Sequence, residues 1–288
     1  MTGKTLLVGL RADQFRHPLD LAATQSLKQL PGLDTLLRMV ISPLAEQFFH
    51  LENIASSIQV SERQLTDLHN LLLEACRVLD LEPPQLYVRQ NPVPNAYTFA
   101  MRGQRPFVVI HTSLLELLTP AEIQAVIAHE LGHLKCDHSL YLTLANLITL
   151  AAYLLPGGEV MAQSLQSQIL AWVRCAEFTC DRAALLVAQD PRVVASLLMK
   201  LSGGSPSLVS QLNLDAFLDQ ARSYEAISED ALGEALKQIR TQDLTHPVPV
   251  LRAKEIDRWA SSQDYFDLVK RGPIEYNKDS SKGGWRNW

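Results

Sequence analysis

Two histidines stand four residues apart, at His129 and His133, and Glu130 directly follows the first. Residues four apart in a helix lie about 40° apart around its axis, so both imidazoles face one side and can share a metal ion. Glu130 lies one step further round, close enough to take a proton from a water molecule on the metal but poorly placed to bind the ion itself. The segment HELGH therefore predicts a hydrolytic zinc centre.

A catalytic zinc ion needs a third protein ligand and keeps one position open for water. The extended motif with a third histidine would need glycine at Cys136 and histidine at Ser139, so the chain lacks that motif. Two downstream acids are candidates, Glu159 and Glu177. We favour Glu177 because Asp181 follows it by four residues on the same helical face, where it can accept the free N–H of a ligand histidine.

Two more residues with possible metal-binding groups follow the motif. Cys136 points to roughly the same side as the two histidines, but a thiolate there would fill the position that catalytic zinc leaves open. We therefore expect Cys136 to be an ordinary small buried residue. His138 comes nine residues after His129, half a turn round the helix, so we expect it on the far side of the helix and outside the metal site.

The elements that must position these residues can be predicted from the same sequence. Apolar residues recur at helical spacing from Leu19 to Leu79, which predicts helices in the first part of the chain. Three short runs in the segment 86–110, LYV, AYTFA and PFVVI, predict a small sheet that contains a hairpin. Thr119, followed by Pro120 and by Glu122, has the pattern of a capping box and predicts the start of the HELGH helix.

The remainder of the chain is again mainly helical in its pattern. A helical block runs from about 161 to 189, and most of the sequence to 260 continues in the same way. We therefore predict an α+β fold that is mainly helical, with a small mixed or antiparallel sheet beside the HELGH helix. The expected organisation is an N-terminal helical region (1–84) packed on a catalytic domain (85–260), followed by a C-terminal tail (261–288).

Composition and charge limit the possible partners and the expected location. The formal net charge is −5 and the isoelectric point is about 5.9, so no basic surface is expected and nucleic acid is excluded as a partner. The first residues do not form a secretory signal. The four cysteines include no C-x-x-C pair, which indicates free thiols in a reducing compartment. We expect a cytoplasmic protein, with membrane association as an open option.

The segment 140–155 is the candidate for membrane contact. As a helix it would span roughly 24 Å, which is less than the hydrocarbon core of about 30 Å. A single crossing would separate the histidines from Glu177, and the following segment carries too many polar residues for a second crossing. Two interpretations stay open, namely a helical hairpin within 140–175 that touches a membrane peripherally, or a part of the soluble fold.

Four motifs together resemble a known family. HELGH (129–133), EFTCD (177–181) and THPVPVLR (245–252) follow one another, and NAYTFA (95–100) precedes them. In these motifs the sequence resembles the gluzincin zinc metallopeptidases, the family of the HtpX heat-shock proteases and the CAAX prenyl endopeptidases, as a compact member. The resemblance runs from about Asp20 to Arg258, and it implies a zincin-like fold of the minigluzincin type.

The resemblance also implies a role for each matching residue of the metal site. One zinc ion per chain would be bound by His129, His133 and Glu177, with Glu130 as the general base. His246 would help to stabilise the developing oxyanion. The alternative for His246 is a structural one, in which it caps the turn before a proline.

Three further residues inherit roles in substrate binding. Asn95 and Ala96 would lie on an edge strand that accepts the backbone of an extended substrate. Their alternative is an ordinary strand entry after a proline. Arg252 would either assist in substrate binding or only pair with a carboxylate.

These residues together predict a zinc-dependent endopeptidase that acts on a protein or peptide substrate. Two alternatives stay open. The first is a zinc-binding protein that serves as a scaffold or chaperone-like partner and cleaves nothing. The second is a zinc peptidase that trims small peptides from one end, although the chain has no Gly-x-Met-x-Asn element of the kind that recognises an N-terminus.

Overall fold

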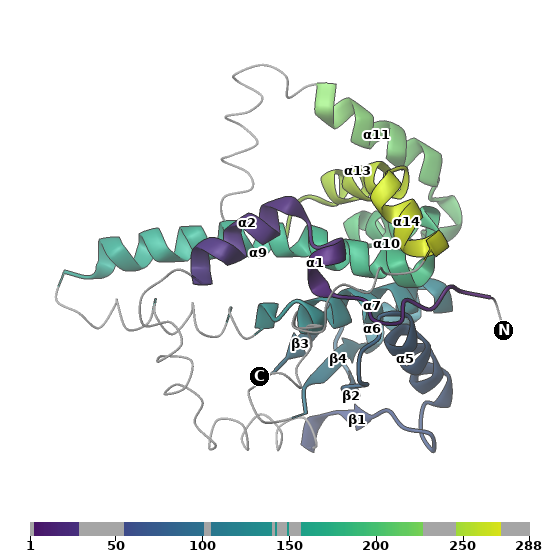
Figure 1. Ribbon diagram of the computed structural model, residues 1–288. Coiled ribbons are helices and arrows are strands. Elements are labelled where there is room, and N and C mark those ends of the chain that lie inside the picture. Colours follow the sequence, from purple (N-terminus) through teal and green to yellow (C-terminus); the bar gives the residue numbers. More distant parts are fainter. Residues whose placement is uncertain are drawn as a thin grey trace.

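The structure is a computed structural model, and it describes residues 3–28, 55–100, 105–139, 142, 149, 157–226 and 246–271 (Figure 1). In these ranges a small sheet lies below a long helix, and further helices surround both. The predicted α+β fold with a predominance of helix is confirmed.

The described strands form a mixed sheet in the order β1-β2-β4-β3. They are β1 (Ile58–Gln59), β2 (Gln85–Arg89), β3 (Ala96–Phe99) and β4 (Phe107–His111). β4 pairs with β2 in parallel and with β3 antiparallel, which confirms the predicted hairpin. The sequence did not predict β1, because two residues are too short to show an alternating pattern. Among the described strands β3 lies at an edge, and its outer side is not paired with another strand.

The two faces of the sheet carry different apolar side chains. Alternate residues of a strand point to opposite faces, and both faces of β2 and β4 are buried. One face enters the main core through Leu86, Val88, Val108 and Ile110. The other face carries a small cluster of Tyr87, Phe107 and Val109, with Tyr97 and Phe99 of β3 packed against it.

Helix α7 (Pro120–Lys135) carries the HELGH segment and begins as predicted. The Thr119 hydroxyl accepts a hydrogen bond from the Glu122 backbone N–H, and the Glu122 carboxylate accepts one from the Thr119 backbone N–H at 2.8 Å. The same carboxylate pairs with Lys200 at 2.6 Å. The capping box therefore both starts the helix and ties that start to a neighbouring element.

Helix α9 (Glu159–Ala188) packs directly on α7, and Gly132 lies at their contact (Figure 1). A Cβ atom on Gly132 would lie 3.0 Å from the Cys180 Cα atom and 3.0 Å from the Ala183 Cβ atom. This separation is tighter than normal carbon contacts, so only glycine allows the two backbones to approach this closely. The close contact brings the side chains of the two helices together.

The other helices hold this pair from several sides. Near the N-terminus α1 (Ala12–Phe15) and α2 (Pro18–Lys28) pack against α9, and α5 (Thr66–Val78) packs against α7. α6 (Thr112–Leu117) follows β4 directly. The C-terminal group consists of α10 (Pro191–Gly203), the 3-10 turn η1 (Val209–Gln211), α11 (Leu214–Ala226), α13 (Pro249–Ala260) and α14 (Gln263–Arg271). Within this group α10 packs on α7 and α9, and α13 packs on α9.

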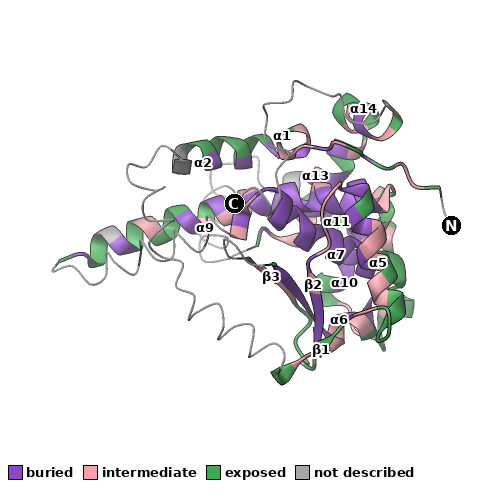
Figure 2. Cartoon of the chain, turned by 60° about the horizontal axis from the view of Figure 1, so that its bottom comes forward, coloured by how far each residue is buried: buried purple, intermediate pink, exposed green. Residues whose placement is uncertain are grey.

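A large buried cluster extends through these elements (Figure 2). It contains Leu7 near the N-terminus, Leu131 on α7 and Leu268 on α14. The N-terminal segment and the start of the predicted tail therefore contribute to the same core as the sheet and α7. The expected boundaries at 84 and 260 stay predictions.

Most of the predicted membrane-contact segment 140–155 lies outside the described residues. Within the described ranges, no helix combines the length and the apolar character that a bilayer crossing requires. The proposed contact of 140–175 with a membrane surface stays a prediction.

We expect Gly132→Ala to lower the free energy of unfolding by about 1–3 kcal/mol, because the added methyl group meets the α9 backbone in a filled core. Urea unfolding of the full chain measures this. Gly203→Ala is a matched control, since nothing lies within 4 Å of its added Cβ atom. Equal stabilities of the Gly132 variant and the wild type would show that the α7–α9 contact can relax.

Candidate metal centre

His129 and His133 on α7 direct their Nε2 atoms toward Glu177 on α9. The distance from His129 Nε2 to Glu177 Oε2 is 3.3 Å, and the distance from His133 Nε2 to Glu177 Oε1 is 3.4 Å. The structure therefore brings together the two imidazoles and the carboxylate that the sequence predicted as metal ligands. Glu159, the less favoured candidate, is exposed at the start of α9 and does not line the cleft described below.

The donor set at this point fits a zinc ion. Glu177 is buried, and although ring nitrogens of His129 and His246 lie near its Oε2 atom and an Arg252 nitrogen lies 3.5 Å from it, no described residue meets this oxygen with full hydrogen-bond geometry. Burial opposes ionisation, but His129 above all, then His133 and His246, keep the pKa of Glu177 well below its usual value. A buried anionic oxygen without a hydrogen bond is costly unless a cation compensates it. Two imidazole nitrogens and one such oxygen are the ligand types of catalytic zinc.

Asp181 and Arg252 support His129 from behind. Asp181 Oδ1 lies 3.1 Å from His129 Nδ1, so the carboxylate accepts the Nδ1–H and leaves Nε2 free for a metal. Arg252 on α13 donates to both Asp181 oxygens, at 2.8 Å from Nε and 2.6 Å from Nη2. Burial opposes ionisation of Asp181, but the Arg252 guanidinium lowers its pKa and keeps it anionic. Of the two roles expected for Arg252, these contacts support pairing with a carboxylate.

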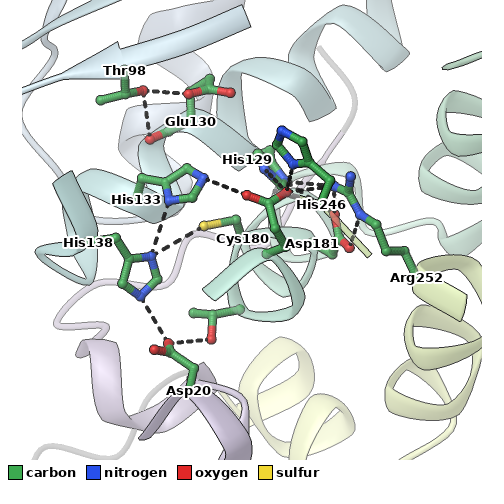
Figure 3. A network of polar contacts seen from close by, with 12 residues as sticks. Asp20, Thr98, His129, Glu130, His133, His138, Cys180, Asp181, His246 and Arg252 are labelled. Atoms are coloured by element: carbon green, nitrogen blue, oxygen red, sulfur yellow. Dashed lines mark hydrogen bonds and ion pairs between the residues drawn. The ribbon is translucent and has the colours of Figure 1, made fainter. Parts of the chain in front are cut away.

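Glu130 lies beside the ligands but faces the sheet. The Thr98 hydroxyl on β3 donates a hydrogen bond to Glu130 Oε2 at 2.7 Å (Figure 3). The same hydroxyl lies 3.3 Å from the Glu130 backbone oxygen. Thr98 therefore fixes the position of the carboxylate beside the two imidazoles, where it could take a proton from a water molecule.

His246 stands at the rim of the site, just before α13. Its side chain is 58% exposed, and its Nδ1 atom lies 2.7 Å from Glu177 Oε2. The ring therefore contacts the metal centre directly and also reaches solvent, which the alternative of a purely structural turn cap does not require.

A cleft of about 420 Å³ opens on this centre. One wall is the edge strand β3 with the residue before it, and it includes Asn95 and Ala96. The lining also includes an apolar face of α9 together with Glu130, His133, Glu177 and His246. The structure therefore places the two residues predicted to contact a substrate backbone in one cleft with an apolar surface. The apolar residues of that surface are Ile169, Leu170, Trp172, Val173 and Ala176.

The prediction that His138 lies on the far side of the helix is wrong. Helix α7 ends at Lys135, and Asp137 has a positive φ of 60°, which turns the chain back toward the site. His138 Nδ1 lies 3.3 Å from His133 Nδ1, and its Nε2 lies 3.0 Å from Asp20 Oδ2. The prediction assumed a continuing helix, and a left-handed aspartate gives no strong signal in the sequence.

Asp20 on α2 was not recognised as part of the site at all. It lies 118 residues before His138 in the chain and belongs to no motif. Its only sequence signal is an acid in the first turn of a helix, which is ordinary in any protein.

Cys180 is a second possible third ligand, since its Sγ atom lies within 4.8 Å of ring nitrogens of His129 and His133. Burial, and then the Glu177 charge, raise the pKa of this thiol well above its usual value. The Cys180 Sγ atom also lies 3.7 Å from His138 Nδ1. The ionised Glu177 is therefore the better ligand. Cys136 is buried and free, as expected.

Comparisons with known proteins identify the family of the chain. The sequence model described as Peptidase family M48 matches residues 62–260. The chain is 57% identical over 267 residues to the plastoglobule-localized metallopeptidase 48, chloroplastic, of Arabidopsis thaliana, which aligns 92% of this chain and 78% of that protein. It is 30% identical over 190 residues to protease HtpX homolog 2 of Methanosarcina mazei, which aligns 56% of this chain and 64% of that protein.

A protein of the same name from Methanosarcina acetivorans is 33% identical over 170 residues, which covers 50% of this chain and 58% of that protein. The chain thus spans less than two thirds of the length of both archaeal relatives. The predicted resemblance to HtpX-type zinc peptidases is confirmed. Because the family model matches more than half of the chain, and its named relatives are proteases, this chain belongs to peptidase family M48 and is a metal-dependent protease.

Proposed function

We propose that the chain is a zinc endopeptidase that cleaves extended protein or peptide segments in the cleft between β3 and α9. The observation that carries the proposal is the meeting of two imidazole Nε2 atoms with the buried carboxylate of Glu177, directly beside Glu130. His129, His133 and Glu177 would hold one zinc ion per chain. Bound there, zinc would polarise a substrate carbonyl and lower the pKa of a water molecule toward neutrality.

Glu130 and His246 would have separate roles in the reaction. Glu130, oriented by the Thr98 hydroxyl, would take a proton from the attacking water and deliver it to the departing amine. His246 would donate a hydrogen bond toward the oxygen that becomes negative as the carbonyl is attacked. Both groups line the cleft, so both can reach a substrate there.

The shape of the cleft supports cleavage within a chain. The edge of β3 offers backbone groups to an extended peptide, and Asn95 and Ala96 lie where such a peptide would pair. Among the described residues that line the cleft, the ionisable side chains lie at or beside the metal centre, apart from the phenol of Tyr97. No described lining group is thus placed to bind a terminal ammonium or carboxylate further along.

The apolar α9 wall would select large apolar side chains near the bond that is cut. Ile169 and Trp172 are buried, while Leu170 and Val173 are partly accessible from the cleft. Apolar surface of this kind favours apolar ligands because water leaves both surfaces on binding.

The location of the chain belongs to the proposal as well. The printed name of the plant relative assigns that protein to chloroplast plastoglobules, whereas the composition of this chain led us to expect the cytoplasm. We propose peripheral contact with a lipid surface through 140–175. Val160, in that segment, is 77% exposed and would be free to meet such a surface.

We expect Glu130→Gln to retain zinc and to lower the rate of casein cleavage by about 10²–10⁴-fold, because glutamine accepts the Thr98 hydrogen bond but cannot take a proton. Metal analysis and a digestion assay on the same preparation measure both. Glu116→Gln, an exposed glutamate on α6, is the matched control. An unchanged rate for the Glu130 variant would refute its role as general base.

We expect a chelator to abolish cleavage and added zinc to restore it, and we expect the products of a long peptide to be internal fragments. Mass spectrometry of early products separates the possibilities. Single residues released in order from one end would support the trimming alternative. Zinc-loaded protein that binds a specific protein and cleaves nothing would support the scaffold alternative.

We propose that Arg252 acts on the centre through Asp181. Arg252→Met is expected to lower the free energy of unfolding by about 3–5 kcal/mol at neutral pH, because it removes the guanidinium partner of the buried Asp181 carboxylate and leaves only the hydrogen bond from His129. Arg192→Met, which breaks the exposed pair with Asp215, is expected to cost about 0–1 kcal/mol. Urea unfolding of the metal-free chain compares the two.

The effect of Arg252→Met should depend on pH in a defined direction. The pKa of Asp181 is depressed in the folded chain, so the ion pair stabilises the fold above the unfolded pKa of about 3.9. This contribution is lost as the pH falls through the folded pKa. The difference between the variant and the wild type should therefore narrow in acid, and a constant difference would contradict the assigned pair.

A further inference from the structure

A second chain of polar contacts approaches the centre from the N-terminal helix α2 (Figure 3). Asp20 Oδ2 lies 3.0 Å from His138 Nε2, and His138 Nδ1 lies 3.3 Å from His133 Nδ1. The Asp20 side chain is fully buried and the His138 side chain is 3% exposed. The contact between Asp20 and His138 is therefore shielded from solvent.

Asp20 is held in place by several donors. The hydroxyls of Thr179 and Thr24 donate to it at 2.7 and 2.9 Å, and an Arg16 nitrogen lies 3.6 Å away. Each of these groups favours the ionised form of the buried carboxylate. Asp20 is therefore an anion with a fixed position, and it can only accept hydrogen bonds.

The contacts fix where each proton lies when His133 Nε2 binds a metal. His133 must then carry its proton on Nδ1. Because the facing atom is His138 Nδ1, this nitrogen must accept, and the Cys180 thiol at 3.7 Å is a weak second donor to it. A neutral His138 then has its proton on Nε2, where Asp20 accepts it. Each ring N–H of the two histidines therefore meets one acceptor.

We infer that Asp20 and His138 are positioning residues, which form a relay that fixes the tautomer and the ring orientation of the metal ligand His133. This inference rests on the proposed zinc centre. The relay gives His133 what Asp181 gives His129 directly, a carboxylate behind the metal-binding ring. It also makes α2 a part of the centre, although α2 lies before residues 62–260, which the family model matches.

The proton positions can be measured without any substitution. We expect long-range ¹H–¹⁵N NMR of the zinc-loaded full chain, labelled with ¹⁵N-histidine, to show the proton of His133 on Nδ1 and that of His138 on Nε2. A proton on His138 Nδ1, alone or with one on Nε2, would overturn the relay.

Variants test the same inference through zinc affinity. Asp20→Asn and His138→Leu are expected to weaken zinc binding about 10–100-fold in competition with a chelator. His138→Asn should bind zinc more tightly than His138→Leu, because its Oδ1 atom can replace Nδ1 as the acceptor for His133. Phe15→Leu is the control, since Phe15 is a fully buried residue of α1 that contributes to the core and not to the relay.

The outcomes separate the relay from the proposed function. Zinc affinities of the Asp20 and His138 variants equal to that of Phe15→Leu would overturn the relay, even if the wild type cleaves casein. The expected tautomers in the wild type, together with the expected order of zinc affinities among the variants, would support the relay. If that wild type cleaves nothing, only the proposed function is refuted.

Discussion

The burial of one negative charge, the carboxylate of Glu177, is the constraint on which the rest of the centre depends. An isolated anion in the interior is strongly unfavourable, so the chain must supply positive or polarised groups around it. It does so with three imidazoles, from His129, His133 and His246. The geometry that surrounds the carboxylate with imidazoles is also the geometry that we propose for binding one cation. Burial of this charge and the proposed metal binding therefore require the same arrangement.

This arrangement depends on how closely two helices approach. Gly132 removes the side chain that would separate α7 from α9, and the contact places HELGH opposite Glu177 and Asp181. Behind each of the two imidazoles proposed to bind the metal, a buried acid is in turn compensated by an arginine, Arg252 for Asp181 and Arg16 for Asp20. Negative and positive groups thus alternate with distance from the centre. Each outer group lowers the free-energy cost of burying the charged group next to it.

The sequence predicted those parts of the centre that follow from local spacing. The i, i+4 histidines, the capping box at Thr119 and the i, i+4 pair of Glu177 and Asp181 are properties of single helices, and the structure shows all of them on the expected elements. The same reasoning failed at His138, because one left-handed residue after the helix end cancels the helical angle. It could not find Asp20, whose partner is 118 residues away and which has no motif. Helix angles could not decide the role of Arg252 either, since its contact with Asp181 depends on how α13 packs on α9.

The position of β3 at the edge of the sheet has a consequence for what the protease can distinguish in its substrates. Side chains of an extended chain alternate between two sides with a period of two residues. A peptide that lies along β3 would therefore turn every second side chain toward the apolar wall of α9, while its other side chains point away. Sequence preferences among cleaved peptides should accordingly recur at alternate positions, and intervening positions should tolerate charge and bulk.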